Sequence, residues 1–343
     1  MNLQSQDKLT QNQLPDGHPS VATGKIGLLL VNLGTPDAPD KKAVKRYLKE
    51  FLSDKRVVEI PDIIWQPILR GIILNTRPKK SAHAYGLVWT DEGSPLAVYT
   101  RRQAEALAKN LGDDVQVDWA MRYGNPSIPS RLQAMKDAGC ERILVAPLYP
   151  QYSGATTASV HDAVFDAIKA MRWQPAIRML PPYHDDSDYI AALKSSVETG
   201  LASLDFEPDA VIASFHGMPK RTLELGDPYH CHCQKTARLL SEAMGRELTI
   251  TFQSRFGPAK WLEPATDLTL EKLAQDGKSK VVIFAPGFSS DCLETYEELA
   301  IRGKEGFEAA GGERFAYIPC LNDSDVGIDL LDKLVRRELA GWI

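Results

Sequence analysis

Residues 280–302, KVVIFAPGFSSDCLETYEELAIR, combine the pattern of a buried strand with a turn and an acidic helix. The run from Val281 to Ala285 is continuously apolar, as in strands that are covered on both faces of a parallel sheet. Pro286 and Gly287 end this strand, because proline lacks a backbone donor and glycine permits a sharp reversal. The segment therefore predicts a parallel α/β sheet with a helix leaving the carboxyl end of one strand.

The acidic part of this segment places Asp291, Glu294 and Glu298 three and four residues apart. On an α-helix this spacing lines three carboxylates along one face, where like charges cost roughly 0.2–0.5 kcal/mol per pair. One interpretation is a solvated first turn, which the helix dipole favours. The other is a ligand site, because open α/β sheets bind ligands beyond the carboxyl ends of their strands. Oxygen ligands there would receive a divalent cation or protons.

Apolar runs of the same kind recur, with helical patterns between them, and predict strands over residues 25–34, 115–121, 142–148, 210–215 and 248–252. Strands that alternate with helices indicate an α/β fold with parallel sheets. Two pairs of stretches also resemble each other: LLVNLGTP and VIASFHGMP, and ERILVAPLYPQYSGATTAS and KVVIFAPGFSSDCLET. This repetition predicts two similar lobes that face each other across a cleft.

The division of the chain follows from these patterns. Residues 1–23 are polar and lack the apolar core of a signal peptide, so we expect a disordered leader. We assign residues 24–180 to an N-terminal lobe and residues 181–324 to a C-terminal lobe. A helix over residues 325–343 is expected to pack back on the N-terminal lobe.

The composition narrows the function. The 343 residues carry a net charge of −5, which gives no electrostatic footprint for nucleic acid. Five cysteines without framework spacing indicate a reducing compartment, and we expect a cytoplasmic protein. No apolar run approaches the roughly 18–20 residues of a membrane span. No strand-end turn carries a GxGxxG or Walker A pattern, so a nucleotide is not indicated.

Residues 61–74, PDIIWQPILRGIIL, carry more apolar surface than one helix stripe requires. Burial in the core is one interpretation. The other is a lip that faces a ligand or a membrane, which would make the protein peripheral at the inner face of the membrane.

A second informative turn is ASFHGMPKR, residues 213–221. His216 follows an apolar strand and precedes Gly217, so its imidazole lies at the carboxyl end of a strand, as the acidic row does. Neutral histidine, with an ordinary pKa near 6.5, accepts a proton or coordinates a metal at physiological pH. A purely structural histidine is the alternative. If the two lobes close on each other, His216 is expected to face Glu294.

Longer motifs resemble one known family. SFHGMPKR, GDPYHCHCQKT, TFQSRFGPAKWLEPATD and APGFSSDCLETYEEL, with LLVNLGTP, MRYGNPSI and APLYPQYSGATTAS, are similar to ferrochelatase in the correct order over residues 25–325. The resemblance implies two Rossmann-like lobes of flavodoxin-like topology around a porphyrin cleft. It also implies a lyase of haem biosynthesis that inserts ferrous iron into a porphyrin.

The resemblance also implies site residues. His216 matches the motif histidine and Glu294 its partner across the macrocycle; these are the expected catalytic pair and, with Asp291 and Glu298, the expected metal-handling set. Arg122 and Tyr123 match an Arg-Tyr pair of the family. Further matches to cleft-lining, substrate-binding positions are Leu33, Tyr149, Ser153, Thr156 and Trp261.

Metallation must strip water from Fe(II), remove two pyrrole protons and pucker the ring. A neutral histidine can take a proton, while carboxylates bind iron or relay protons, and apolar walls hold the ring distorted. We assign His216 as proton acceptor and Glu294 as the carboxylate that handles iron or relays protons. The opposite assignment also fits the sequence.

Leu33 bears on the substrate, because relatives that use coproporphyrin tend to have tyrosine at this turn. Leucine favours protoporphyrin IX, with coproporphyrin III as the alternative. A cobaltochelatase of the same fold would add a second histidine, and Cys292 occupies the loop where one is expected. A non-enzymatic tetrapyrrole-binding protein would need neither His216 nor Glu294.

Departures from the family pattern predict no iron–sulfur cluster and no permanently bound cofactor. The internal cluster cysteine of animal members is replaced by Gly154, and the chain stops at Ile343. The run His230-Cys231-His232-Cys233 alternates ligands on an expected strand or loop, a poor cage for a metal, so Cys231 and Cys233 are assigned a structural or incidental role. Arg302 interrupts the acidic path. Iron and protoporphyrin are the expected partners, and no oligomeric state is predicted.

Overall fold

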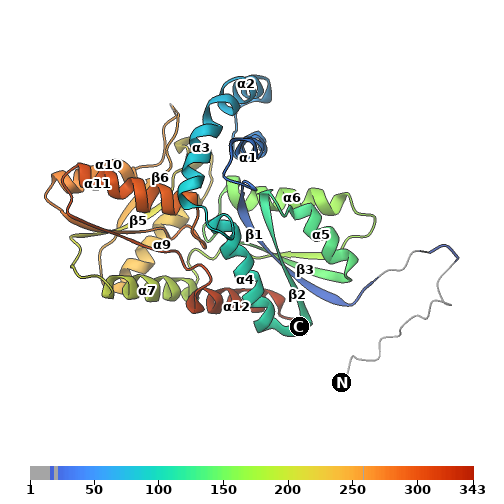
Figure 1. The fold of residues 1–343 in the computed structure, drawn as a ribbon. Coiled ribbons are helices and arrows are strands. Elements are labelled where there is room, and N and C mark those ends of the chain that lie inside the picture. The colour runs from blue at the N-terminus through green and yellow to red at the C-terminus, as the bar shows by residue number, and fades with distance from the viewer. Residues whose placement is uncertain (1–15, 19–21, 258) are drawn as a thin grey trace.

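The computed structural model describes residues 16–18, 22–257 and 259–343. The predicted disordered leader therefore lies almost entirely outside the described residues. Two sheets, each of four parallel strands, form the centres of two lobes that lie side by side (Figure 1). Their strands are β1 Lys25–Thr35, β2 Val115–Gly124, β3 Cys140–Pro147 and β4 Ala176–Met179, then β5 Ala210–His216, β6 Thr249–Gln253, β7 Lys280–Phe284 and β8 Arg314–Ile318.

Helices cover both sheets, so the predicted α/β class is confirmed. Those between β1 and β4 are α1 Lys41–Ser53, α2 Asp62–Ile68, η2 Leu69–Ile73, α3 Leu74–Val88, α4 Pro95–Leu111, η3 Gly112–Asp114, α5 Ile128–Asp137, η4 Gly154–Ala158 and α6 Ser159–Lys169. Those that follow are α7 Ser187–Ala202, α8 Lys220–Glu224, α9 Tyr229–Met244, α10 Thr266–Gln275, η5 Glu294–Gly303, α11 Lys304–Ala309 and α12 Asp325–Leu339.

The lobes repeat one topology. The strand orders are β2-β1-β3-β4 and β6-β5-β7-β8, so β1 corresponds to β5 and β3 to β7. The stretches that resemble each other in the sequence lie on these central strands. Both β3 and β7 lead into a π-helix, η4 and η5, a helix type that is frequent at functional sites. Because of this repetition, the carboxyl ends of the central strands in both sheets are candidate positions for a functional site.

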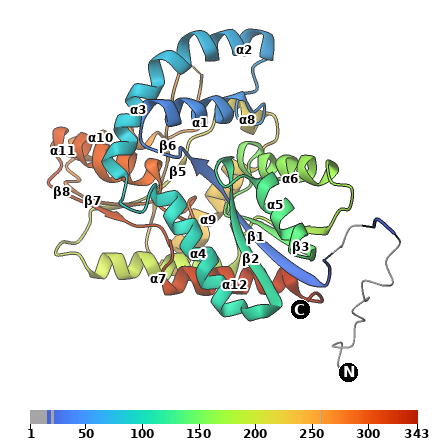
Figure 2. The ribbon, with the colours of Figure 1, turned by 45° about the vertical axis from the view of Figure 1, so that its right-hand side comes forward.

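The buried core runs through both lobes. On β1, Leu28 and Leu30 pack into one hydrophobic cluster while Leu29 and Val31 pack into another, because successive side chains of a strand point to opposite faces. The first cluster also contains residues of β5, β7 and α12. Helix α12 packs against α4 and β3 as well as α7, and it runs along the edge where the lobes meet (Figure 2).

Strands β4 and β8 were missed by the sequence patterns. Both are short edge strands whose residues are mostly half-buried, so neither carries the continuous apolar run that identified the central strands. None of the helices in the described parts of the chain is long and apolar enough to cross a membrane.

Candidate active site

His216 is the last residue of β5 and its side chain is half-buried. Its Nδ1 lies 2.7 Å from the carbonyl oxygen of Gly217. A carbonyl only accepts hydrogen bonds, so Nδ1 carries the proton in the neutral ring and Nε2 is the free base. Glycine is required next to it, because a Cβ at position 217 would lie 2.3 Å from the carbonyl oxygen of Gln253. The turn therefore presents the imidazole with a defined tautomer.

The acidic segment differs from its prediction. It is a π-helix that begins at Glu294, so the expected row of three carboxylates on one α-helical face is wrong. Asp291 precedes the helix, is fully buried and accepts hydrogen bonds from Tyr317 and Asn322. Glu294 and Glu298 remain on the helix that follows β7. Since β5 and β7 are neighbouring strands of one sheet, His216 and Glu294 belong to the same lobe, and lobe closure is not needed to bring them together.

Glu294 is held through its backbone and surrounded by aromatic side chains. The Nε2 of Gln253 donates to the carbonyl oxygen of Glu294 at 2.8 Å. Burial raises the pKa of the Tyr85 hydroxyl, and the Glu294 carboxylate raises it further. Burial lowers the pKa of Arg77, and Glu294 opposes that effect. The carboxylate therefore faces residues of α3 in the N-terminal lobe.

Glu298 lies deeper along η5. Its carboxylate accepts hydrogen bonds from the backbone N–H of Ser254 at 2.7 Å and from the Ser254 hydroxyl at 2.5 Å. Burial raises the pKa of Glu298, while these bonds and the charges of His216 and Arg302 oppose the rise. A cavity of about 260 Å³ between η5, α10 and α11 is bordered by Glu298 and Arg302. Glu298 thus connects the surroundings of His216 with this cavity.

Arg122 and Tyr123, near the end of β2, belong to a partly buried network around one ion pair. One oxygen of Asp54 accepts from Arg122 at 2.6 Å, from the Tyr123 hydroxyl at 2.8 Å and from the Ser159 hydroxyl at 2.7 Å. Tyr123 is only 1% exposed, so its side chain supports this hydrogen-bond network and has almost no free surface for a ligand. The sequence analysis missed Asp54, whose partners are distant in the chain.

The other predicted lining residues are spread over both lobes. Leu33 packs against one hydrophobic cluster that Leu293 also contacts and against another that Phe288 contacts, and the Phe288 ring lies 6.4 Å from that of His216. The Tyr149 hydroxyl is buried without a hydrogen-bond partner among the described residues. Ser153, fully buried, lies before η4, and the Thr156 hydroxyl donates to its carbonyl oxygen at 3.4 Å.

Trp261 lies at the rim of the same region. Its indole N–H donates to the carbonyl oxygen of Phe256 at 3.0 Å. The guanidinium of Arg77 lies 4.7 Å from the Phe256 ring centre. Because Arg77 belongs to α3, this cation–π contact joins the two lobes at the rim.

The His-Cys-His-Cys run lies on helix α9, so the expected strand or loop is wrong. His232 stacks on His184 with ring centres 3.5 Å apart and accepts a hydrogen bond from the Tyr152 backbone. Burial and the neighbouring His232 lower the pKa of His184 to about 4. Cys233 is buried and Cys231 exposed, on different sides of the helix. Across the described residues, no three His, Cys, Asp or Glu side chains are grouped as a metal site would require.

Gln253, the last residue of β6, makes hydrogen bonds that connect parts of the site and was not predicted from the sequence. Its backbone carbonyl accepts from Gly217 at 2.7 Å, and its side chain bonds Ser214 and the backbone of Glu294. It therefore connects the turn of His216 with the start of η5. Its only signal in the sequence is its place in the TFQSRFGPAKW motif.

Two parallel α/β lobes with a histidine and carboxylates at adjoining strand ends define a two-lobed chelatase-like protein. The solved structure titled SirB from Bacillus subtilis with Fe³⁺ shares this fold: it has a TM-score of 0.58 and 13% identity, and the match covers 93% of this chain and 97% of that one. CbiX, titled the terminal enzyme for siroheme biosynthesis in denitrifying bacteria, has a TM-score of 0.51 and 13% identity over 92% and 100%.

Sequence comparison identifies the family. The ferrochelatase profile matches residues 25–339. A ferrochelatase of Rhizobium etli is 56% identical over 336 residues, covering 96% of this chain and 98% of that protein. A ferrochelatase of Rhizobium meliloti is 57% identical over 333 residues, covering 95% and 98%. The chain belongs to the ferrochelatase family.

Proposed function

We propose that this protein inserts Fe(II) into protoporphyrin IX, forming protohaem with release of two protons. Membership of the ferrochelatase family makes iron insertion into a porphyrin, a step of haem biosynthesis, the reaction of this metal chelatase. The choice of porphyrin and the roles of individual residues are our proposal. The observation that carries the roles is that His216 ends β5 while Glu294 begins η5, the helix that follows the neighbouring strand β7 of the same sheet.

His216 is proposed as the proton acceptor, because its Nδ1–H is bonded to a carbonyl and leaves Nε2 free for a pyrrole N–H. Glu294 is proposed to bind the incoming iron or to relay the second proton. Glu298, with a pKa raised by burial, is suited to carry protons away from His216 toward the cavity beside η5. The two pyrrole protons thus leave as two N–H bonds break, while iron loses water ligands and becomes bonded to all four pyrrole nitrogens, with no change in the oxidation state of iron.

The apolar surroundings support protoporphyrin IX, whose vinyl groups are apolar. Leu33 is partly buried and packs against two hydrophobic clusters, one that contains Tyr123 and one that contains Met121, so a propionate at this edge would lose water without gaining a charged partner in either cluster. Coproporphyrin III, with four propionates, is therefore disfavoured.

The test is anaerobic Fe(II) insertion into protoporphyrin IX and coproporphyrin III, followed by absorbance. Wild type is compared with Glu294→Gln, with His216→Ala and with Glu305→Gln, a control that removes an exposed carboxylate from nearby α11. We expect turnover of protoporphyrin by wild type and the control, and loss of at least about 100-fold in both site variants, the scale of a lost acid–base group.

Other outcomes would redirect the proposal. Faster turnover of coproporphyrin by wild type would overturn the substrate, and preference for Co(II) would favour a cobaltochelatase. Porphyrin binding without turnover would favour a carrier. A His216→Ala enzyme with a near-normal rate would remove the assigned base in either version of the mechanism.

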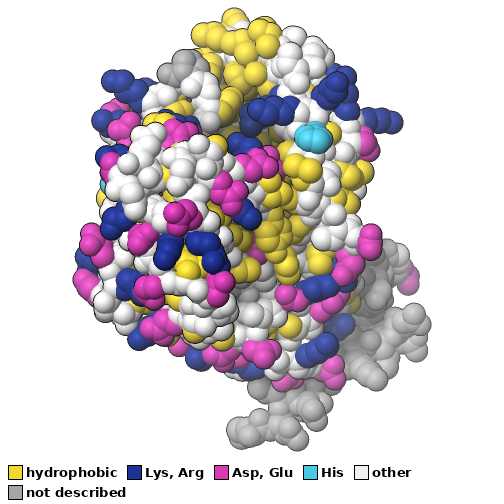
Figure 3. Space-filling view, turned by 60° about the vertical axis from the view of Figure 1, so that its left-hand side comes forward, with side chains coloured by type: hydrophobic (Ala, Val, Ile, Leu, Met, Phe, Trp, Pro, Cys, Tyr) yellow, Lys and Arg dark blue, Asp and Glu magenta, His cyan; other side chains and the backbone are white. Residues whose placement is uncertain are grey.

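We propose, further, that residues 61–74 contact a membrane surface. Trp65, Leu69 and Leu74 of this segment are buried, whereas Ile63 is 86% exposed and Ile72 57%. Hydrophobic side chains gather at the top of the molecule, where α2 lies, and continue down the middle of the same face (Figure 3). One face of the segment is therefore buried in the core, and the other is exposed and free to enter a bilayer interface.

Flotation with vesicles of phosphatidylethanolamine and phosphatidylglycerol tests this surface. Wild type is expected to float and Ile63→Asp to stay in the lower fractions, because burying one isoleucine side chain is worth about 1.5–3 kcal/mol. Leu268→Asp, which alters an exposed leucine of α10, is the matched control. Equal flotation of all three proteins would refute the assignment.

A further inference from the structure

Asp291 is the predicted metal-handling residue that is fully buried, and both of its carboxylate oxygens are hydrogen-bonded. Its Oδ1 accepts from the Thr295 hydroxyl at 2.8 Å and from the Tyr317 hydroxyl at 2.5 Å. Its Oδ2 accepts from the Nδ2 of Asn322 at 2.6 Å. All three partners are neutral donors. Three of the roughly four acceptor positions of this carboxylate are thus filled by protein donors, and Asp291 has no exposed surface through which a ligand could reach it.

The bond to Asn322 is reciprocal. The backbone N–H of Asp291 donates to the Oδ1 of Asn322 at 2.7 Å, so each residue both donates to and accepts from the other. Asn322 has a φ of 50°, a left-handed conformation that asparagine adopts more readily than most residues. The pair therefore joins the loop after β7 to the loop after β8 in one geometry.

The pair also reaches the N-terminal lobe. The carbonyl oxygen of Asn322 accepts from the Nε2 of Gln103 at 2.8 Å, and the Oε1 of Gln103 accepts from Ser290 at 3.2 Å. Gln103 lies on α4 and is 1% exposed. Thr295, bonded to Asp291, is the neighbour of Glu294 on η5. The network thus runs from α4, through Asn322 and Asp291, to the first turn of η5.

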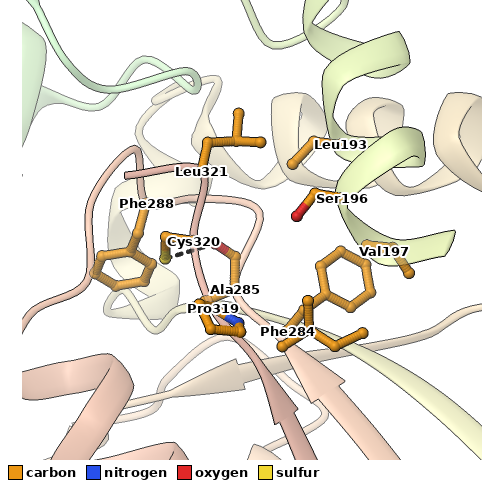
Figure 4. Close-up of a pocket in the computed structure, with 10 residues that line it drawn as sticks. Leu193, Ser196, Val197, Phe284, Ala285, Phe288, Pro319, Cys320 and Leu321 are labelled. Carbon is orange, nitrogen blue, oxygen red and sulfur yellow. Dashed lines mark hydrogen bonds between the residues drawn. The ribbon is translucent and has the colours of Figure 1, made fainter. Parts of the chain in front are cut away.

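One apolar cavity, bordered by Cys320, is too small for hydrated iron. Cys320, whose thiol lies 3.6 Å from the Tyr317 hydroxyl, borders an apolar cavity beside β7 together with Phe284, Phe288 and Leu321 (Figure 4). Its volume of about 10 Å³ holds at most one water molecule. A metal with its water ligands would have to displace the packed side chains.

We infer that Asp291 is a positioning residue and not a metal ligand: paired with Asn322, it fixes the start of η5 and thereby the carboxylate of Glu294. This inference rests on the proposed function of Glu294. Asp291 and Asn322 act as one unit, in which the arrangement of donors and acceptors matters and the site of the negative charge does not.

The test exchanges the two residues. The pair Asp291→Asn with Asn322→Asp keeps a donor facing an acceptor at every bond of the network while moving the carboxylate from 291 to 322. Asn322→Asp alone sets two carboxylates against each other, and Asp291→Asn alone brings two amides together. For each protein we would measure kcat, KM for Fe(II) and for porphyrin, and the melting temperature.

A positioning role predicts that Asn322→Asp lowers kcat roughly tenfold or more and lowers the melting temperature, and that adding Asp291→Asn restores both to within about threefold and a few degrees. KM for Fe(II) should change less than threefold throughout. A metal-ligand role predicts the reverse: Asp291→Asn alone raises KM for Fe(II), and the exchange does not rescue it. That result would overturn the inference.

The two proposals fail differently. If wild type does not insert iron, the proposed function falls, whereas recovery of the melting temperature in the exchanged protein still reports whether the pair acts as a unit. If wild type turns over and the exchanged protein recovers neither rate nor melting temperature, the positioning role falls and the proposed function stands.

Discussion

Removing the side-chain bonds of Gln253 should lower kcat more than its effect on stability explains. In Gln253→Leu, which keeps a similar volume, the carbonyl oxygen of Glu294 loses a donor at 2.8 Å and the Ser214 hydroxyl loses an acceptor at 2.8 Å. Gln253 is 2% exposed, so water does not replace these bonds. At about 1–2 kcal/mol each, the loss of stability is about 2–4 kcal/mol.

The effect on rate follows from geometry. Without Gln253 the first turn of η5 is free to shift against β6, and a misplacement near 1 Å costs up to roughly 100-fold in rate. We therefore expect kcat for iron insertion to fall about 10- to 100-fold, which is about 1.4–2.7 kcal/mol of transition-state stabilisation. KM for porphyrin should change much less, because the walls that Leu33 and Tyr149 are proposed to form remain in place.

The assay needs a control that is equally destabilised elsewhere. Leu334→Ala on α12 removes a side chain that is 4% exposed in the core between the lobes, at a cost of about 2–5 kcal/mol. Both variants would be assayed below their melting temperatures. A kcat for Gln253→Leu within twofold of that for Leu334→Ala would refute the reasoning, because the loss would then be one of general stability.

Three further predictions follow from single residues. Gly217→Ala sets a Cβ 2.3 Å from the Gln253 carbonyl oxygen, so the melting temperature and the rate should both fall, whereas Gly306→Ala, with open space around it, should leave the rate unchanged. Burial raises the pKa of Glu298, so its ionisation destabilises the fold as pH rises above about 4.5 through the folded-state pKa; the melting temperature of Glu298→Gln relative to wild type should therefore increase between pH 4.5 and pH 8. Burial raises the pKa of Asp54, but its bonds to Ser159 and Tyr123 and the charge of Arg122 outweigh burial, so the pKa is lowered. Asp54→Asn should therefore melt at a lower temperature than wild type at pH 7, and the difference should shrink as pH falls below 3.8.

The central strands were predictable because each is an apolar run buried on both faces. Residues 25–34 and 280–285, for example, agree with β1 and β7 to within one residue. The helix type after β7 was not predictable, since the spacing of three carboxylates was interpreted with an α-helical period and the segment is a π-helix. The same error assigned Asp291 to the face of Glu294.

The missing parts of the site share one physical cause. Gln253, Asp54 and Asn322 act in the site through hydrogen bonds to residues between 31 and 219 positions away, and no pattern near them in the sequence marks these partners. His216 and Glu294 were predictable because His216 ends the central strand β5 and Glu294 begins the helix that comes after the neighbouring strand β7. Positions at strand ends can be found from local pattern, whereas the network that holds them depends on the folded arrangement.

Comparison of the two repeated lobes shows why the proposed catalytic groups belong to the C-terminal lobe alone. Aligning VNLGTP with SFHGMP sets Gly34 on Gly217 and Leu33 on His216, and aligning the two Ala-Pro pairs sets Ala155 on Glu294. A Cβ at Gly34 would lie 1.9 Å from the Tyr123 carbonyl oxygen, so both glycines serve the same close approach of neighbouring strands. The shared backbone is thus kept in both lobes, while the base and the carboxylate of one are replaced by leucine and alanine in the other. Both groups proposed to handle iron and protons, His216 and Glu294, therefore come from the C-terminal lobe.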